Sequence, residues 1–253
     1  MRKIIHDDYF EVALSGDYER AFPNIREGKV RLPINIAKGS GCYIEILESL
    51  AGQMLSMLCN HNKLITIRFD LRLYEYSGNN KKITDFIRPL RKWLQNKYGT
   101  NEVGYVWVRE QETAKQQHYH FVLLLDGNKV KSSKAIFDRI EHIASYRDIS
   151  AWLPKNPFNK IIRGDLKAFS EAFERGSYLA KERGKGYKDK TANNYSASEI
   201  TIRPKTLAEE LAFFKLIPPN DATSKKKPKT KTKFVRQEAS NHAIQLDLFA
   251  LVA

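Results

Sequence analysis

Residues 105–110 read YVWVRE and residues 117–125 read QHYHFVLLL, and these two stretches decide the fold. Both are rich in β-branched, aromatic or leucine residues, and the second ends at Asp126-Gly127, a turn signal. The polar connection between them predicts a β-hairpin. Alternate residues of a strand share a face, so His118 and His120 point the same way. A hairpin centred near Ala114 places Glu110 directly across from His118.

Two imidazoles and a carboxylate that converge on one point form a ligand set for a divalent metal ion. The pattern therefore predicts a metal site at Glu110, His118 and His120, with Glu112 as the alternative third ligand because it has the same strand parity. Two histidines on the solvated face of an edge strand would satisfy the same pattern. His-x-His pairs also arise by chance, so the pair alone leaves both interpretations open.

A second motif lies in the segment from Asp165 to Arg183, which has the apolar spacing of a helix. Asp165 is the expected N-cap and Gly184 the expected stop. Tyr178 and Lys181 share a face of this helix, together with Arg175 one turn earlier. A tyrosine between two cations suits attack on a phosphodiester, because positive charge favours the phenolate and balances the phosphate. The alternative is a half-buried tyrosine on an amphipathic helix with ordinary surface charges.

In this order, the two motifs resemble those of the HUH endonucleases, the superfamily of rolling-circle replication initiators, relaxases and single-strand transposases. The resemblance is nearest to the inovirus-type initiators of filamentous phages and related prophages, and it covers about residues 40–205. Two details depart from the pattern. The residue between the histidines is Tyr119 rather than a bulky aliphatic, and position 182 is glutamate, so the next tyrosine is Tyr187. A single-tyrosine mechanism is therefore expected.

The resemblance implies a fold, a reaction and site residues. The fold would be α+β, a ferredoxin-like and mainly antiparallel sheet of about five strands with helices on one face. Tyr178 would attack DNA to give a 5′-phosphotyrosine and a free 3′-OH that primes replication, with Lys181 offsetting charge. Mg²⁺ or Mn²⁺ would be bound by the predicted ligands. Contacts to single-stranded and origin DNA are expected at four cationic residues, Arg68, Arg72, Arg175 and Lys185.

Residues 64–76 have the clearest strand pattern, with apolar and polar residues in strict alternation. Arg68 and Arg72 fall on its polar face, where they either contact phosphates or are simply solvated.

The remaining expected elements are helices at 9–21, 43–59, 83–98, 132–146 and 207–216, and strands at 29–36, 160–163 and 200–203, with a loop over most of 149–163.

The chain carries a formal charge of +14 and has a pI near 9.6, which points to an acidic partner such as nucleic acid. Part of this charge lies in the lysine-rich stretch 221–233, which we expect to be disordered. Cys42 and Cys59 have no ligand or redox spacing and suit a reducing cytosol. No apolar run is long enough for a membrane span, so we expect no membrane association and a location in the bacterial cytoplasm.

The terminal stretch Gln245-Leu246-Asp247-Leu248-Phe249 resembles the pentapeptide that binds the bacterial sliding clamp. The alternative is a short apolar helix that folds back on the body. The expected organisation is an N-terminal extension (1–40), an endonuclease domain (41–220), and a basic linker with the clamp peptide (221–253). A host helicase is a further expected partner.

Two other functions stay open. The same core could serve a single-tyrosine transposase or a mobilisation relaxase. From a different class, the chain could be a non-enzymatic DNA-binding adaptor that docks on the clamp, with His118 and His120 as surface residues.

Overall fold

The computed structural model describes residues 3–25, 28–36, 40–111, 116–185 and 192–204, all within one compact unit, Met1–Leu216. The expected helix at 207–216, the lysine-rich stretch and the clamp peptide lie outside the described residues. The strands are β1 (Ile4–Ile5), β2 (Tyr9–Ala13), β3 (Lys29–Pro33), β4 (Cys42–Tyr43), β5 (Lys63–Leu73), β6 (Gly104–Glu110), β7 (His118–Asp126), β8 (Ile149–Trp152), β9 (Phe158–Ile162) and β10 (Tyr195–Ala197). The helices are α1 (Ile44–Asn60), α2 (Lys81–Tyr98), α3 (Lys134–Ser145) and α4 (Leu166–Ser177), with 3₁₀ turns η1 (Gly16–Ala21) and η2 (Tyr178–Ala180).

A six-stranded antiparallel sheet forms the centre of the fold, in the order β10-β6-β7-β5-β8, with β9 also paired to β5. The long strand β5 pairs with β7 along one edge; along its other edge, β9 pairs with its first half and β8 with its last four residues. This arrangement confirms the predicted α+β class with an antiparallel sheet. The segment 149–163 contributes two strands rather than mostly loop, because Pro154 and Pro157 lie between and beside them instead of breaking one strand.

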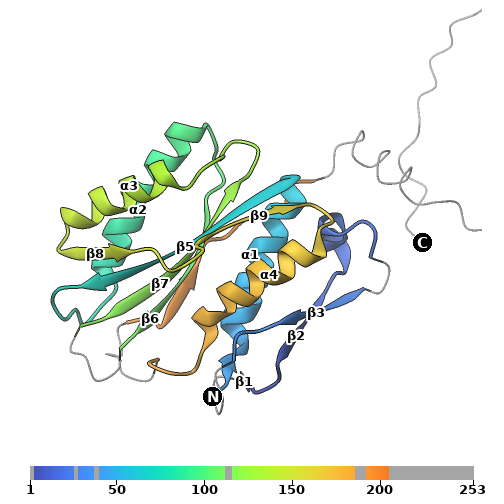
Figure 1. The fold of residues 1–253 in the computed structure, drawn as a ribbon, viewed down its shortest axis with the longest axis horizontal. Helices are drawn as coiled ribbons and strands as arrows, with labels where there is room; N and C mark the ends of the chain where they lie inside the picture. Colours follow the sequence, from blue (N-terminus) through green and yellow to red (C-terminus); the bar gives the residue numbers. More distant parts are fainter. Residues whose placement is uncertain (1–2, 26–27, 37–39, 112–115, 186–191, 205–253) are drawn as a thin grey trace, which may run out of the picture. The chain divides into compact units, whose positions relative to one another are not determined.

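Helices cover both faces of the sheet, so the expectation of helices on one face was wrong. On one face, α2 and α3 pack against the alternating apolar residues of β5, from Ile65 to Leu73. On the other face, α1 and α4 pack against Leu64 of β5 and against Val106 and Val108 of β6. Figure 1 shows the sheet between these two helix pairs. The polar face of β5 is thus only partly open, at its Arg68–Arg72 end.

The described residues before β4 pack against α1 and α4. Strands β2 and β3 pair as a hairpin, and η1 lies against α1. The expected helix at 9–21 was wrong, because alternate residues of β2 are buried, a strand pattern: Phe10 and Val12 face the core while Tyr9, Glu11 and Ala13 face solvent. The Phe10 ring stacks on Phe173 of α4 with centroids 6.1 Å apart. This hairpin therefore supports the helix that leads to Tyr178.

The helix predicted to run to Arg183 ends earlier, at Ser177, and continues as the single 3₁₀ turn η2. Asp165 caps it as expected, since its side chain accepts a hydrogen bond from the Ala168 amide at 2.9 Å. The edge strand expected at 200–203 lies instead at Tyr195–Ala197. Among the described residues, no helix combines the length and apolar character needed to cross a membrane.

Candidate active site

The β6–β7 hairpin brings the predicted metal-binding residues to one end of the sheet. Glu110 lies opposite His118, which confirms the predicted register. On the other side of β7, strand β5 places Asp70 opposite His120 and Arg72 opposite His118. Three neighbouring strands therefore present polar side chains on the same face, next to the end of α4.

His120 lies between two carboxylates. Its Nε2 is 3.1 Å from Glu110 Oε2, and its Nδ1 is 2.8 Å from Asp70 Oδ1. The approach to Asp70 is close but poorly aligned, so Nδ1 and Oδ1 are buried without a directed hydrogen bond among the described residues. Burial alone would lower the pKa of His120, but Asp70 and Glu110 raise it above its ordinary value. The His120 ring is thus placed between two carboxylates, both of which favour its protonated form.

Lys185 is the buried partner of Glu110. Its Nζ lies 2.6 Å from Glu110 Oε1 and also donates to the Lys181 carbonyl. Burial alone would raise the pKa of Glu110, but the hydrogen bond with His120 and the Lys185 ammonium lower it to about 2. We expected Lys185 among the DNA contacts; its side chain is instead fully buried, so in this arrangement it cannot reach DNA.

Tyr178 meets this cluster from the end of α4. Its ring lies edge to face against the His120 ring, with centroids 5.3 Å apart and planes at 83°. Arg68 Cζ lies 4.1 Å and Lys181 Nζ 4.3 Å from the centroid of the Tyr178 ring. The two sequence motifs, far apart along the chain, are therefore brought together as predicted.

The electrostatic surroundings of Tyr178 differ from those we expected. Burial and the Glu110 carboxylate raise the pKa of Tyr178, and the nearby Arg68 only partly offsets them. Two cations beside the ring do not favour the phenolate here, because the carboxylates of the same cluster lie close by. The tyrosine is consequently a neutral phenol at neutral pH.

Close packing and backbone hydrogen bonds fix the position of the tyrosine segment. Gly176 touches α1 so closely that a Cβ there would lie 2.8 Å from Leu50 Cδ2. Beyond the tyrosine, Lys181 forms a β-bridge with Cys42, and the Glu182 amide donates to the Gly41 carbonyl at 2.9 Å. The chain on both sides of Tyr178 is thereby held against α1 and β4.

The arginines expected at the DNA surface separate into two groups. Arg68 and Arg175 line a small cavity of about 90 Å³, beside Asn159, whose Oδ1 accepts from Arg175 Nη1 at 2.6 Å. Arg72 is exposed four residues further along β5, opposite His118. The cavity therefore adjoins Tyr178 through Arg68, whereas Arg72 flanks the far side of the histidines.

The residue types fit a divalent cation, and their arrangement fits it in part. Glu110 Oε2 and His120 Nε2 have a separation that two ligands of one ion can have. Asp70 faces the other ring nitrogen of His120, as carboxylates do beside metal-bound imidazoles. Yet in the part of the chain that the structure describes, no three His, Cys, Asp or Glu side chains are placed so that they could hold a metal ion. A cation at Glu110 Oε2 would lie close to the Lys185 ammonium on Oε1, so the two positive charges would compete for one carboxylate.

Sequence reasoning missed Asp70 and the burial of Lys185. Asp70 occupies a polar position of β5 between Arg68 and Arg72, so the alternation marked its face. Its partner depended on the register between β5 and β7, which the sequence does not reveal. No local signal marked Lys185, because a lysine after Gly184 is typical of a solvated loop.

The chain is thus an α+β protein with a tyrosine, a histidine and two carboxylates clustered at the end of an antiparallel sheet. It belongs to the YagK/YfjJ C-terminal domain family, a family of prophage-associated proteins, whose model matches residues 28–197. The match runs from β3 to the end of β10 and includes every residue of the cluster. A search of curated proteins found no match, and neither did a search of solved structures.

Proposed function

We propose that this protein is an HUH-type endonuclease that initiates rolling-circle replication by nicking and rejoining single-stranded DNA. One observation carries the proposal: the Tyr178 ring lies against His120, within the cluster formed by Glu110, Asp70 and Arg68. A nucleophile beside histidines and carboxylates is the arrangement that this chemistry requires. The association of the family with prophages supports a role in replication of a mobile element.

Tyr178 would attack the phosphorus of the scissile phosphodiester. A bond forms between the phenolic oxygen and phosphorus, and the bond from phosphorus to the 3′ oxygen breaks. The phenol proton ends on the released 3′ oxygen, so the products are a 5′-phosphotyrosine and a 3′-OH that primes synthesis. Rejoining is the reverse transesterification and needs no nucleotide cofactor. Arg68 and Lys181, both beside the ring, would offset the charge on the phosphate.

Mg²⁺ or Mn²⁺ is the proposed cofactor, with Glu110, His118 and His120 as its ligands. When bound, the ion would supply a positive charge that polarises and orients the phosphate. Asp70 would hold the second nitrogen of the His120 ring and so fix the orientation of the imidazole. Lys185 would leave Glu110 as the ion enters.

The DNA path would follow the open part of the polar face. Phosphates would contact Arg68 and Arg175 at the small cavity beside Tyr178, and Arg72 on the other side of the histidines. Asn156 also lines the cavity, and its amide can hydrogen-bond to phosphate or base edges, whereas the Asn159 amide is engaged by Arg175 and Thr66. The terminal pentapeptide 245–249 would recruit the bacterial sliding clamp to the new primer, and a host helicase would open the duplex.

A second function is favoured by one observation. Glu110 is paired with Lys185, and the described residues hold no three-ligand metal cluster. A DNA-binding adaptor that docks on the clamp and has no nuclease activity would need neither the metal nor Tyr178. A transposase or relaxase would share the nicking chemistry and differ only in its DNA target.

A covalent-adduct assay tests the proposal. The full chain is incubated with single-stranded oligonucleotides that tile its own replicon, with Mn²⁺ or EDTA, and resolved on a denaturing gel. We expect a metal-dependent shifted band that is lost in Tyr178→Phe and kept in Tyr146→Phe, a matched change at an exposed tyrosine. A band that survives Tyr178→Phe would assign the nucleophile to another residue, and Tyr187 would be the next tyrosine to test. Tight binding without any adduct would support the adaptor.

A further inference from the structure

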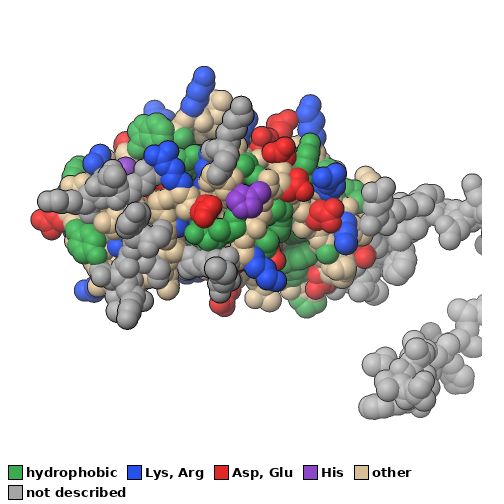
Figure 2. All heavy atoms as spheres, turned by 90° about the horizontal axis from the view of Figure 1, so that it is seen from below, with side chains coloured by type: hydrophobic (Ala, Val, Ile, Leu, Met, Phe, Trp, Pro, Cys, Tyr) green, Lys and Arg blue, Asp and Glu red, His purple; other side chains and the backbone are tan. Residues whose placement is uncertain are grey.

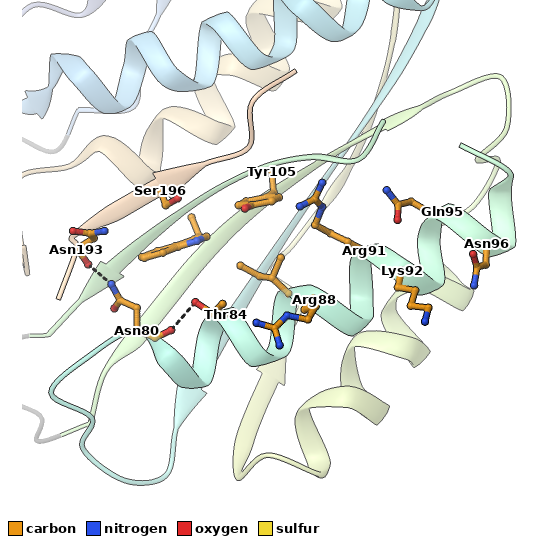
Figure 3. Close-up of a pocket in the computed structure, with 12 residues that line it drawn as sticks. Asn80, Thr84, Arg88, Arg91, Lys92, Gln95, Asn96, Tyr105, Asn193 and Ser196 are labelled. Carbon is orange, nitrogen blue, oxygen red and sulfur yellow. Dashed lines mark hydrogen bonds between the residues drawn. The ribbon is translucent and has the colours of Figure 1, made fainter. Parts of the chain in front are cut away.

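A second groove lies on the opposite face of the sheet from Tyr178, between α2 and strands β6 and β10 (Figure 3). Its volume is about 720 Å³. The face follows from the strand alternation: Tyr105 and Trp107 of β6 point into the groove, whereas Val108 and Glu110 point toward the histidines. Nothing in the proposed nicking chemistry uses this groove.

One wall of the groove is cationic. Arg88, Arg91 and Lys92 of α2 are exposed and line it, and Figure 3 shows them in a row along the helix. No Asp or Glu is among the residues that line it, and within the described part of the chain no carboxylate pairs with these three side chains. The whole helix carries six Lys or Arg residues against one Asp.

On the face that Figure 2 shows, acidic and basic side chains are interspersed. A groove lined with cations and without carboxylates indicates an anionic ligand.

The opposite wall offers an aromatic surface. Tyr105 is partly exposed, and its ring lies 5.9 Å from Arg91 Cζ. Trp107 is mostly buried against Tyr119, so Tyr105 is the ring that a ligand can stack on. Two residues further along the same face of β6, Arg109 is buried, and its Nε and Nη1 have no hydrogen-bond partner among the described residues. The two aromatic residues of β6, Tyr105 and Trp107, are thus followed on the same face by the positive charge of Arg109.

Amide and hydroxyl side chains line the rest of the groove, at Gln95 and Asn96 of α2, at Asn193, and at Ser196 of β10 (Figure 3). These groups both donate and accept hydrogen bonds, as base edges require. Asn80 is already engaged, because it accepts from the Tyr119 hydroxyl at 3.0 Å and donates to the Asn193 carbonyl at 3.1 Å.

We infer that the groove between α2 and β10 binds a segment of single-stranded nucleic acid, through phosphate contacts to Arg88, Arg91 and Lys92 and stacking of a base on Tyr105. Cations that follow a backbone, combined with an aromatic platform, are the usual means of binding unpaired strands. The volume falls in the range of small-ligand pockets, about 300–1,000 Å³, which suits one or two splayed bases rather than a duplex.

The topology links this groove to the Tyr178 face. Strand β10 is the edge of the sheet, and its Ser196 lies opposite Trp107 while its Tyr195 lies opposite Val108. Adjacent residues of one edge strand therefore belong to the two faces. A single strand held in the groove reaches the other face by passing around this edge, so the groove would hold DNA flanking the nick.

Fluorescence anisotropy with a labelled oligothymidine tests the inference in the full chain. Replacing both Arg88 and Arg91 with Ala should weaken binding by about tenfold and reduce the slope of log affinity against log salt by about 1.4, since each phosphate contact to single strands contributes about 0.7. The control pair Lys81→Ala and Lys97→Ala removes two exposed charges of the same helix outside the groove. The inference would be overturned if both double variants lost the same affinity for oligothymidine, or if the variant lacking Arg88 and Arg91 lost none.

Two further measurements isolate the site. Tyr105→Leu should weaken binding with an unchanged salt slope and abolish photocrosslinking to the peptide that contains residue 105, whereas a crosslink that persists elsewhere contradicts the assignment. Preference for duplex DNA or for an acidic protein over oligothymidine would also contradict it. Binding in the groove does not depend on the nickase, and only its place beside a nick rests on the proposed function: Tyr178→Phe should bind oligothymidine like the wild type even where it forms no adduct.

Discussion

The ammonium group of Lys185 is fully buried and lies 2.6 Å from Glu110 Oε1. The carboxylate proposed as a metal ligand is thus already neutralised by a cation of the chain itself. Breaking a buried ion pair leaves an uncompensated charge, so one cation must replace the other. Lys185 and a divalent ion would therefore compete for Glu110.

Replacing Lys185 with Met should raise the affinity for Mn²⁺ by about tenfold or more, because the competing ammonium is gone. Without metal, the variant should lose about 3 kcal/mol of stability, and Mn²⁺ should restore it. Calorimetry and thermal unfolding measure the two effects. Lys181→Met is the matched control, since Lys181 lies beside Tyr178 without a bond to Glu110. Equal Mn²⁺ affinity in wild type and Lys185→Met would contradict competition.

The acid stability of the protein should depend on Glu110. Its pKa is lowered from 4.5 to about 2 in the folded state, so its contribution is complete above pH 4.5 and disappears as the pH falls toward 2. This contribution is at most about 3 kcal/mol. Urea unfolding between pH 2 and 6 should show a weaker pH dependence in Glu110→Gln than in wild type. The exposed Glu174→Gln should behave like wild type.

Gly176 should couple helix packing to nicking. A Cβ at this position would meet the buried Leu50 side chain, so Gly176→Ala should cost about 1–3 kcal/mol and displace Tyr178 from His120. Adduct formation should slow by more than the loss of folded protein explains. Adding Leu50→Ala to Gly176→Ala should restore part of the lost stability and part of the lost rate of adduct formation. A double-mutant cycle measures this coupling. Simple additivity of the two changes would show that they do not act through this contact.

The terminal pentapeptide should bind the sliding clamp. Replacing both Leu248 and Phe249 with Ala should weaken binding to an immobilised bacterial clamp by about thirtyfold or more, because apolar anchors dominate such contacts. Surface plasmon resonance measures this, with Val252→Ala as a control outside the pentapeptide. Nicking of oligonucleotides should be unchanged in both variants. Unaltered clamp affinity in the double variant would refute the assignment.

Local patterns predicted much of this fold. The alternation along β5 and the position of Glu110 opposite His118 depend on strand periodicity and a short hairpin, which the sequence displays directly. The pairing of Asp70 with His120 depends on which residues of distant strands align, and no local pattern encodes that register. The raised pKa of Tyr178 likewise follows from its burial and from a carboxylate on another strand, and both depend on the tertiary fold.

The cluster is built from contacts between distant parts of the chain. Gly41 and Cys42 hold the segment after Tyr178, Glu110 binds Lys185 across 75 residues, and β10 completes the sheet last. During synthesis, the chain up to β9 contains both histidines, both carboxylates and the supporting residues Gly41 and Cys42, but it lacks Tyr178 and Lys185. If the proposed function holds, a chain made only as far as β9 could not yet cleave DNA with this site. The order of elements along the chain thus places Tyr178 after the histidines and carboxylates of the cluster and before Lys185.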